Sequence, residues 1–574
     1  MIDILFLNLH RRYFNYEPTH GGFLGIYLLA AFVRQEGFEA KSFSGTLERG
    51  LKIIDSLCSA RSVSMIGLYC DYENVTENIF LSEYVKSRYR LPVIVGGPQA
   101  TALDKNFFDR SNCDAVVRYE GELTVLELMN CFLEGVGSLG ELDGIAYPLD
   151  GEIKINRERP LIKNLDALPF VDEDCYIDPT HFYRGLSLMT GRGCPFRCAF
   201  CHEGAHTRSV RFRSIENVLA EVDAYIAARQ SDDEFYIFFT DDTLTLDVDR
   251  LRRLCSGMKE RRARARFKWF CEGHVHSLYR HPEMIEYLAA GGCHRLQLGI
   301  ESGTPEVLRA YGKQSTPEEI IEVVGRCRDV GIEQIYSNII LCGAHFDRAV
   351  FENDKQFALR LLEEGRGTVE LGIVTYWPLA ETPMTRRPKE FGLKIIDAEF
   401  LTSVGDFPQV ETAQLDRAEI VRLHNEIEHA IDEKMTAMLE TWQVPSDRIL
   451  RWLEPANNYS RGAWMRKLRQ LPTVHSYHEL LKLGEGLASK DVADLSKAHP
   501  MRTVPLYRYM NAIDGNTIEV CGERFFGVER EIVPLTTGKL SIAEIAARLD
   551  CSLEKAIDVA LRLERKHFVI FAPH

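Results

Sequence analysis

The stretch GRGCPFRCAFC, residues 191–201, directly follows the apolar run 186–190, which has the composition of a short buried strand. Three of the chain's fifteen cysteines are grouped there, at Cys194, Cys198 and Cys201. Thiolates are the usual ligands of iron–sulfur clusters. Because a cubane cluster normally takes four, this CxxxCxxC spacing leaves one iron open. On spacing alone, a zinc site completed by His202 or His206 is the alternative.

Around this stretch, from residue 184 to residue 392, apolar runs alternate with helical patterns such as 214–229 and 316–330. The runs expected as strands are 186–190, 235–240, 267–272, 295–300, 336–341 and 371–376. Six strand–helix units of this kind predict a partial (βα)6 barrel of the TIM type. The active site of such a barrel lies at the carboxyl ends of its strands.

Residues 1–135 show the same alternation, with amphipathic stretches at 25–36 and 76–88. The expected strands are 2–7, 38–43, 63–69, 92–95 and 114–117. Short apolar strands separated by helices predict a doubly wound, Rossmann-like parallel sheet, so the fold class is α/β. Ligands of such a sheet bind beyond the carboxyl ends of the strands.

The rest of the chain divides into three further segments. Residues 136–183 form a connector with a hairpin pattern, IAYPLDGEIKI, that turns at Asp150-Gly151. Residues 393–500 are mainly helical, and residues 501–574 form a small winged-helix-like unit. In that unit Ser541 and Glu544 form a capping box, Ser552 caps a second helix, and 567–571 is a strand.

The net charge of −15 argues against a nucleic-acid or anionic-membrane binder, because both need a cationic face. The C-terminal unit is neutral, which disfavours duplex binding. The longest apolar stretch, 21–33, is shorter than the roughly 20 residues that span a bilayer, and no targeting signal shows. The twelve remaining cysteines are scattered singly, as is typical of a reducing compartment. We expect a cytoplasmic protein that binds neither nucleic acid nor membranes.

Three more segments lie at the carboxyl ends of expected barrel strands: FFTDDT (238–243), LQLGIESGTPEVL (296–308) and NIILCGAHFD (338–347). Together with the cysteine motif they resemble the radical SAM superfamily, whose open cluster iron binds S-adenosylmethionine (SAM) and yields a 5′-deoxyadenosyl radical. The resemblance implies that Asp241 and Asp242 bind the methionine amino group, Glu301 and Ser302 the ribose, and Phe200 the adenine. For Asp241 and Asp242, helix capping is the alternative.

The segments PVIVGGPQAT (92–101) and DAVVRYEGELTVLELM (114–129) resemble the cobalamin-binding domain that precedes many radical SAM barrels. The resemblance implies a corrin site formed by residues at the strand ends: Asn8, Gly96, Gly97, Gln99, Thr101, Glu120, Gly121 and Glu122. The glycines allow close backbone approach. The histidine motif DxHxxG that ligates cobalt in related domains is absent, so Tyr72 or Glu73 is expected below the cobalt. A sheet whose glycines only make turns is the alternative.

These resemblances imply a cobalamin-dependent radical SAM enzyme that methylates an unactivated carbon of a small-molecule or peptide substrate. A flavodoxin- or ferredoxin-type donor would supply its electrons. Tyr376 and Trp377, at the last barrel strand, are expected to line the substrate pocket, unless they belong to the core. A cyclisation or rearrangement without methyl transfer is one alternative, and a non-catalytic iron–sulfur redox sensor is another. The C-terminal unit resembles peptide-recognition domains, or it is a packing cap.

Overall fold

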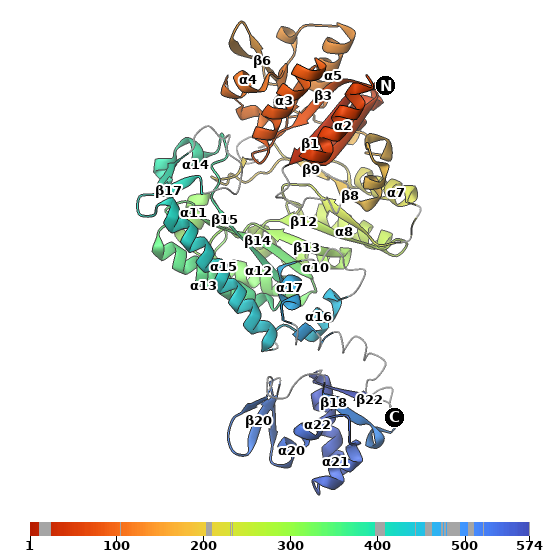
Figure 1. The fold of residues 1–574 in the computed structure, drawn as a ribbon, viewed down its shortest axis with the longest axis vertical. Helices are drawn as coiled ribbons and strands as arrows, with labels where there is room; N and C mark the ends of the chain where they lie inside the picture. The colour runs from red at the N-terminus through yellow and green to blue at the C-terminus, as the bar shows by residue number, and fades with distance from the viewer. Residues whose placement is uncertain are drawn as a thin grey trace. The chain divides into compact units, whose positions relative to one another are not determined.

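The computed structural model describes residues 1–10, 24–103, 105–202, 209–229, 231, 233–396, 408–441, 443–453, 462–471, 474–475, 478, 494–502, 510–520, 522–566 and 568–572. His206, residues 21–23 of the apolar run and residue 567 of the expected last strand lie outside these ranges. The chain forms two compact units (Figure 1). One comprises Met1–Ala358 with Leu371–Ile427, and the other Leu359–Glu370 with Glu428–His574.

The first unit begins with a seven-stranded sheet of order β2-β1-β3-β4-β5-β6-β7. Its strands are β1 (Ile2–His10), β2 (Ala40–Thr46), β3 (Val63–Tyr69), β4 (Val93–Gly96), β5 (Ala115–Val117), β6 (Ile145–Leu149) and β7 (Glu152–Ile155). The pairings among β1 to β5 are parallel. Most residues of these strands are buried because both faces of the sheet are covered.

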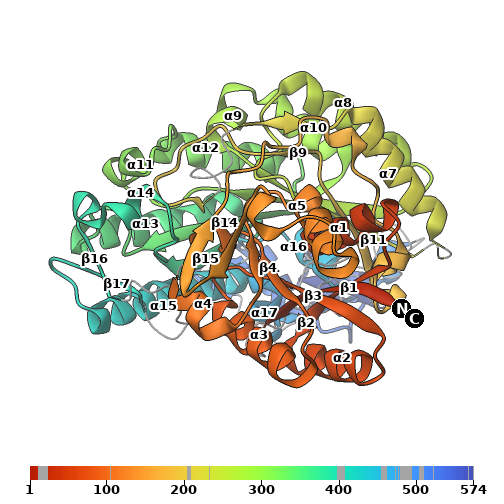
Figure 2. The same ribbon diagram turned by 90° about the horizontal axis from the view of Figure 1, so that it is seen from above.

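Five helices cover this sheet: α1 (Leu24–Gln35), α2 (Leu47–Ser59), α3 (Val75–Tyr89), α4 (Lys105–Ser111) and α5 (Glu122–Met129). Figure 2 shows α1 and α5 on one side of the strands and α2 and α3 on the other. This arrangement confirms the predicted doubly wound sheet.

The hairpin expected in the connector is present as β6 and β7, but it belongs to the sheet. β6 pairs antiparallel with β5, and β7 with β6. The sheet therefore extends to Ile155, beyond the boundary expected at residue 135. The apolar side chains of Ile145 and Ala146 explain the difference, because they are buried against the sheet core.

The barrel is a six-stranded sheet of order β15-β14-β13-β12-β11-β8. Its strands are β8 (Gly185–Leu188), β11 (Phe235–Phe239), β12 (Phe267–Gly273), β13 (Cys293–Leu298), β14 (Gln334–Leu341) and β15 (Val369–Thr375). The pairings from β8 to β14 are parallel. All six strands were predicted within two residues of their observed ends.

Helices form an arc on the outer side of these strands (Figure 2). They are α7 (Ile215–Ala228), α8 (Val248–Arg262), α9 (Val275–Arg280), α10 (Glu283–Gly291), α11 (Pro305–Tyr311), α12 (Pro317–Asp329) and α13 (Arg348–Gly365). Local sequence fixes their starts: Ser214 and Asp247 accept backbone bonds at the first turns of α7 and α8, and Thr316 opens α12 with a capping box. The loops between strand ends and helix starts form the barrel mouth.

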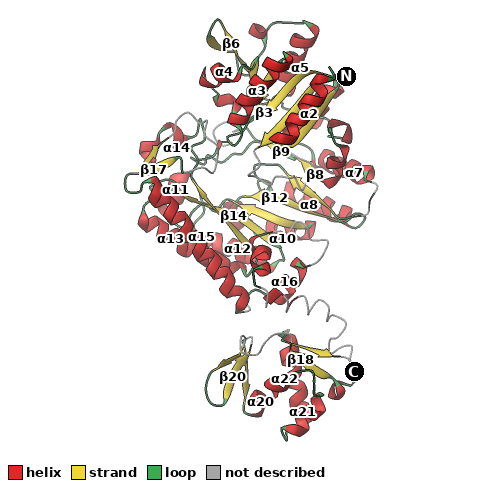
Figure 3. Cartoon of the chain, in the orientation of Figure 1, coloured by secondary structure: helices red, strands yellow, loops and turns green. Residues whose placement is uncertain are grey.

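The described remainder is mixed (Figure 3). It contains α14 (Pro383–Arg386), β16 (Leu393–Ile395), β17 (Val410–Thr412), α15 (Arg417–Glu440), α16 (Ser446–Trp452), α17 (Ala463–Arg469), β18 (His499–Arg502), β19 (Met510–Ala512), β20 (Thr517–Val520), β21 (Glu523–Phe526), α20 (Val528–Leu535), α21 (Ile542–Arg548), α22 (Leu553–Arg565) and β22 (Val569–Ala572). The capping box of Ser541 and the cap of Ser552 form as predicted. The meander β19-β20-β21 was not predicted. Among the described residues, no helix combines the length and apolarity needed to cross a membrane.

Candidate active site

A short hairpin carries the cysteine motif. Its arms, β9 (Gly191–Arg192) and β10 (Arg211–Phe212), pair antiparallel and close the base of a loop that follows β8. Cys194, Cys198 and Cys201 lie in this loop, partly exposed and free of disulfide bonds. Nine other described cysteines are buried, so the motif cysteines differ from them in access as well as in spacing. Accessible thiols on one loop suit the donor set of an iron–sulfur cluster.

The ionisation of two of these thiols depends on burial and on neighbouring charges. Burial, followed by the charges of Asp242 and Cys198, raises the pKa of Cys194 to about 11. Burial also raises the pKa of Cys198, against the opposing effect of the Lys313 cation. Within the described ranges, no three His, Cys, Asp or Glu side chains are close enough together to hold a metal ion. The motif thus gathers the thiols on one loop, and their role as cluster ligands stays a prediction.

Lys313, which was not among the predicted site residues, is a buried cation beside this loop. Its Nζ lies 2.9 Å from Oε1 of Glu301 and donates to the Gly299 carbonyl at 3.1 Å. Burial alone would lower the pKa of Lys313, but the charges of Glu301 and Cys198 outweigh it and raise the pKa. The ammonium also lies 5.7 Å from the centre of the Phe200 ring. A fixed positive charge therefore faces the thiols and the predicted ribose-binding acid.

The two acids predicted for the methionine amino group have different surroundings. Asp241 is buried, and its carboxylate accepts bonds from the Thr190 amide at 2.8 Å and the Thr190 hydroxyl at 2.6 Å. Burial raises the pKa of Asp241 to about 6. Asp241 thus holds the chain just before the cysteine motif, whereas Asp242 acts electrostatically on Cys194 and Glu272. Of the two, Asp242 is the better candidate for a ligand amine.

The two residues predicted to bind the ribose, Glu301 and Ser302, also have different surroundings. Ser302 is fully buried, and its hydroxyl donates to Oδ1 of Asp354 at 2.7 Å while accepting from the Thr304 amide at 3.0 Å. It is therefore part of the loop's internal support. Glu301 adopts a left-handed backbone conformation, with φ of 66°, which is unusual for a residue with a side chain and is often found at functional sites. Asp354, on α13, was not predicted because nothing in its local sequence marks it.

Glu272 is a further acid at the mouth. It lies at the end of β12, and its Oε1 accepts from Gln297 Nε2 at 3.0 Å. Burial, with the neighbouring charges of Asp242 and Glu301, raises the pKa of Glu272 to about 7. Its place at the end of the predicted strand 267–272 was a usable signal. The mouth therefore combines three acids with the cation of Lys313.

The next residues of that loop pack on the cysteine motif. The His274 ring stacks on Phe196 with a centroid distance of 3.6 Å and an angle of 7°. Burial and the Lys313 charge lower the pKa of His274 to about 3, so this imidazole is neutral near pH 7. Phe200 instead packs edge-on against Tyr311 at 5.0 Å. Aromatic contacts thus support the motif from two sides.

Tyr376 and Trp377, both predicted to line the substrate pocket, have different surroundings. Tyr376 is buried, and its hydroxyl lies 3.1 Å from Oγ1 of Thr385, which favours the core alternative for this residue. The Trp377 ring lies 6.4 Å from the ring of Tyr72, which follows β3 in the N-terminal sheet. Tyr72, predicted below the cobalt, and Trp377, predicted for the substrate pocket, are therefore neighbours.

The glycines after β4 have a reason that the sequence did not reveal. Gly97 has a φ of 117°, and a side-chain carbon there would lie 2.6 Å from the Cys70 carbonyl oxygen. A corrin is thus not needed to explain this glycine, because the neighbouring loop already requires it. At Gly96 the nearest atom, Cβ of Val117, would lie 3.5 Å away, an ordinary contact.

A buried amide network supports the same loop. Asn74 Nδ2 donates to Asn8 Oδ1 at 3.4 Å and to the Tyr69 carbonyl at 3.1 Å, and Asn8 donates to Ser44 at 3.4 Å. Gln99 is also buried, and its backbone N–H donates to the Cys70 carbonyl at 3.2 Å. Asn8 and Gln99 therefore lie within the protein interior.

The other residues predicted for cobalamin are more open. Thr101 is half-buried in a short 3-10 turn, Ala100–Ala102, and Tyr72 is exposed. Burial, together with Asp71, raises the pKa of Glu73 to about 7. These residues keep surface that a ligand can reach.

Glu120 and Glu122 were predicted to accept bonds from corrin amides, but both bind arginines of the cysteine hairpin. Arg192 forms ion pairs with both carboxylates, and Arg211 with Glu120. Gly121 lies between them, and a side-chain carbon added there would make only an ordinary contact, 3.4 Å from Cδ2 of Leu29.

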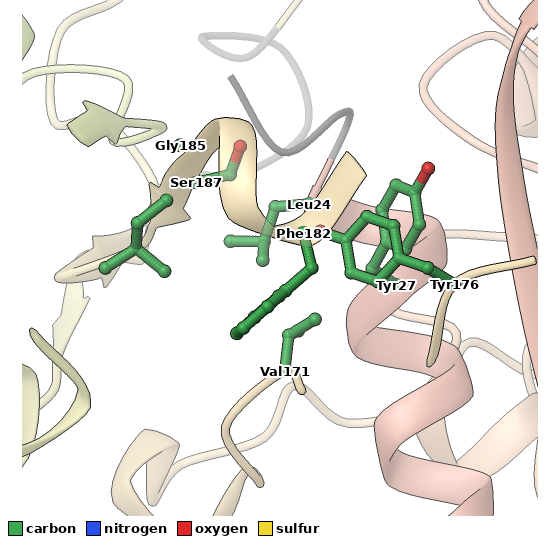
Figure 4. A pocket seen from close by; sticks show the side chains of 8 residues that line it. Leu24, Tyr27, Val171, Tyr176, Phe182, Gly185 and Ser187 are labelled. Atoms are coloured by element: carbon green, nitrogen blue, oxygen red, sulfur yellow. The ribbon is translucent and has the colours of Figure 1, made fainter. Parts of the chain in front are cut away.

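A small apolar cavity of about 10 Å³ lies elsewhere in this unit (Figure 4). It is lined by Leu24, Tyr27, Val171, Tyr176, Phe182, Gly185, Leu186 and Ser187. The rings of Tyr27 and Tyr176 stack at 4.0 Å beside it. A space of this size holds about one water molecule, so it is a packing defect near the start of β8 and not a ligand site.

Residues 188–357 match the radical SAM superfamily. This segment is a radical SAM domain. An uncharacterised methyltransferase of Pyrococcus horikoshii is 29% identical over 341 residues, which cover 56% of this chain and 70% of that protein. The chain spans only 34% and 46% of the length of two further curated relatives.

Solved structures with the same fold include those of two cobalamin-containing proteins. The cobalamin-dependent SAM radical enzyme OxsB with aqua-cobalamin bound has a TM-score of 0.61 at 18% identity, over 98% of this chain and 80% of that one. The radical SAM methyltransferase TsrM of Kitasatospora setae, with cobalamin and a [4Fe-4S] cluster bound, has a TM-score of 0.57 at 16% identity, over 84% and 95%. These likenesses confirm the predicted fold, and the radical SAM domain identifies the chain as an enzyme.

Proposed function

We propose that the protein is a cobalamin-dependent radical SAM methyltransferase that acts on a carbon of a small molecule or peptide. One observation carries the proposal: the loop after β3, predicted to face cobalt, meets the barrel mouth at the Tyr72–Trp377 contact of 6.4 Å. Methyl transfer through two cofactors requires both to reach one substrate, and a cobalamin site opening onto this mouth would meet that requirement. The likeness to proteins named methyltransferases supports it further.

In this proposal Cys194, Cys198 and Cys201 hold a [4Fe-4S] cluster, which when bound supplies one electron to SAM. Asp242 binds the cationic methionine amine. Lys313 keeps a positive charge beside Glu301 and the thiols, and this charge favours the thiolate form of Cys198. Glu301 remains the residue predicted for the ribose.

Cobalamin, when bound, supplies a methyl carrier. Exposed or half-buried residues at the ends of β3 and β4 offer it contact, namely Tyr72, Glu73, Gly96 and Thr101. Asn8, Gly97 and Gln99 would act indirectly, because their contacts shape the loop after β3. The neutral His274 packs on Phe196 of the cysteine motif, and Tyr72 and Trp377 lie where the two proposed cofactor sites would meet.

A labelling experiment tests the reaction. The reduced full chain, loaded with iron, sulfide and hydroxocobalamin, receives SAM labelled with ¹³C on its methyl group and a metabolite extract of a strain lacking the gene. We expect one product with a gained ¹³C-methyl group, and equal amounts of 5′-deoxyadenosine and S-adenosylhomocysteine. A new product without label and without S-adenosylhomocysteine would instead establish cyclisation or rearrangement. Labelled product without 5′-deoxyadenosine would indicate polar methyl transfer.

A further inference from the structure

Two arginines face each other at the base of the cysteine loop. Arg192 on β9 and Arg211 on β10 are direct cross-strand partners in the antiparallel hairpin. Like charges directly opposite one another destabilise a strand pair. Both side chains are largely buried, with exposed fractions of 18% and 10%, so water screens this repulsion poorly. The loop base therefore needs negative charge from elsewhere.

Glutamates at the end of the N-terminal sheet provide that charge. Oε1 of Glu120 lies 3.0 Å from Nη1 of Arg192 and 2.8 Å from Nη2 of Arg211, so it bridges the two guanidinium groups. Glu122, only 4% exposed, pairs with Nη2 of Arg192. Two arginines thus face two carboxylates, and the group is neutral.

The connector completes the arrangement. The Ile162 amide donates to Oε2 of Glu120 at 2.7 Å, and the Ile162 carbonyl accepts from Arg211 Nη1 at 2.7 Å. Burial alone would raise the pKa of Glu120, but the bond from Arg211 and the charge of Arg192 outweigh it and lower the pKa. Glu120 is therefore ionised at neutral pH.

We propose that Glu120 and Glu122 are positioning residues that close the base of the cysteine loop, so that the N-terminal domain controls how the three cysteines are presented. The glutamates act through the hairpin and touch neither cluster nor substrate. Without them, Arg192 and Arg211 repel and the two ends of the loop move apart. The effect on cluster retention rests on the proposed role of the cysteines, whereas the effect on the hairpin does not.

Hydrogen exchange of the full chain without cofactors tests the hairpin directly. In Glu120→Gln, amides of residues 189–202 and 209–214 should exchange at least roughly tenfold faster than in the wild type, because a buried charge has lost its partner. Adding Arg211→Gln to this variant removes one of the opposed cations. Exchange should then return to within about threefold of the wild type.

This rescue separates charge neutralisation from packing. If Glu120 only filled space or made hydrogen bonds, the second substitution would remove further contacts and speed exchange again. Arg157→Gln is the control, because Arg157 pairs with Asp143 in the same domain but is 81% exposed. Amides of β1 and β3 report whether the N-terminal sheet stays folded. If Glu120→Gln unfolds that sheet, Glu122→Gln, which removes only the Arg192 contact, takes its place.

Iron content after anaerobic reconstitution gives the second measurement. We expect Glu120→Gln to retain several-fold less iron after gel filtration, and the double variant to recover it. Unchanged exchange in Glu120→Gln combined with Glu122→Gln would overturn the proposal, as would faster exchange in the rescue variant. If the wild type itself retains no iron, the proposed function fails while the exchange result still decides the role of the glutamates.

Discussion

The carboxyl ends of the two sheets carry different polar residues, and these residues make different contacts. At the N-terminal sheet, Asn8 and Gln99 are buried and bond to neighbouring protein groups. At the barrel mouth, charged groups such as Glu301 and Lys313 face partly exposed thiols. Buried amides that bond one another stiffen a loop, whereas clustered charges at an accessible edge can respond to a ligand.

This difference shows that sequence motifs differ in how reliably they indicate a ligand site. Three cysteines at CxxxCxxC spacing predict a metal or iron–sulfur site from the spacing alone. Glycines and amides serve turns as readily as ligands, and at Gly97 the turn accounts for the residue. Substitutions at the two ends should therefore have different consequences.

The largest effect is expected at the cysteine loop. Cys198→Ala should lose about four irons per chain and all formation of 5′-deoxyadenosine, because a cubane needs each of its protein ligands. Iron and sulfide analysis after anaerobic purification measures this. Cys255→Ala on α8 is the matched control, since Cys255 is buried in the helix layer and should leave iron content unchanged. A wild-type protein with one tightly bound zinc and no iron would contradict the cluster.

Lys313→Met should cost about 3–5 kcal/mol of barrel stability, because it leaves the buried Glu301 carboxylate without its partner. Chemical unfolding followed by tryptophan fluorescence gives the value. Arg309→Met is the control: it lies four residues away, but its pair with Glu306 is exposed, and its loss should cost less than about 1 kcal/mol. If the two substitutions cost the same free energy of unfolding, the buried Lys313–Glu301 pair contributes no more to stability than the exposed Arg309–Glu306 pair.

The sequence predicted both sheets because their periodicity is strong, and it predicted the cysteine loop because spacing alone carries that signal. It missed Lys313 because the residue approaches Glu301 only after α11 turns the chain back at Gly312. It did not indicate the ion pair of Glu120 for a similar reason: a strand-end acid does not reveal that Arg211, 91 residues away, will bind it. Residues that tertiary folding brings together cannot be identified as partners from the local sequence around either one.

The N-terminal loop should respond more moderately. Gly97→Ala should cost about 1–3 kcal/mol, because it combines a positive φ with a contact to the Cys70 carbonyl. Gly96→Ala should leave stability nearly unchanged. Thermal unfolding compares the two, and hydroxocobalamin titration of the Gly96→Ala variant then probes the corrin approach without disturbing the loop. Equal stability of both variants would mean that the Cys70 contact yields easily.

The smallest effect is expected at Glu272 and depends on pH. Burial and the charges of Asp242 and Glu301 raise its pKa in the folded protein to about 7, above its ordinary value of 4.5. The folded state therefore binds the proton more tightly than the unfolded state, and stability falls as the pH rises from 4.5 through 7. Glu272→Gln keeps the shape and removes this ionisation. The variant should match the wild type near pH 5 and exceed it by roughly 1–2 kcal/mol above pH 8, after allowance for solvent screening. Unfolding curves at both pH values measure the difference. If the variant is more stable than the wild type by the same amount at both pH values, Glu272 does not titrate in this window. The negative charges at the barrel mouth would then be neutralised more fully by Lys313 than the raised pKa of Glu272 implies.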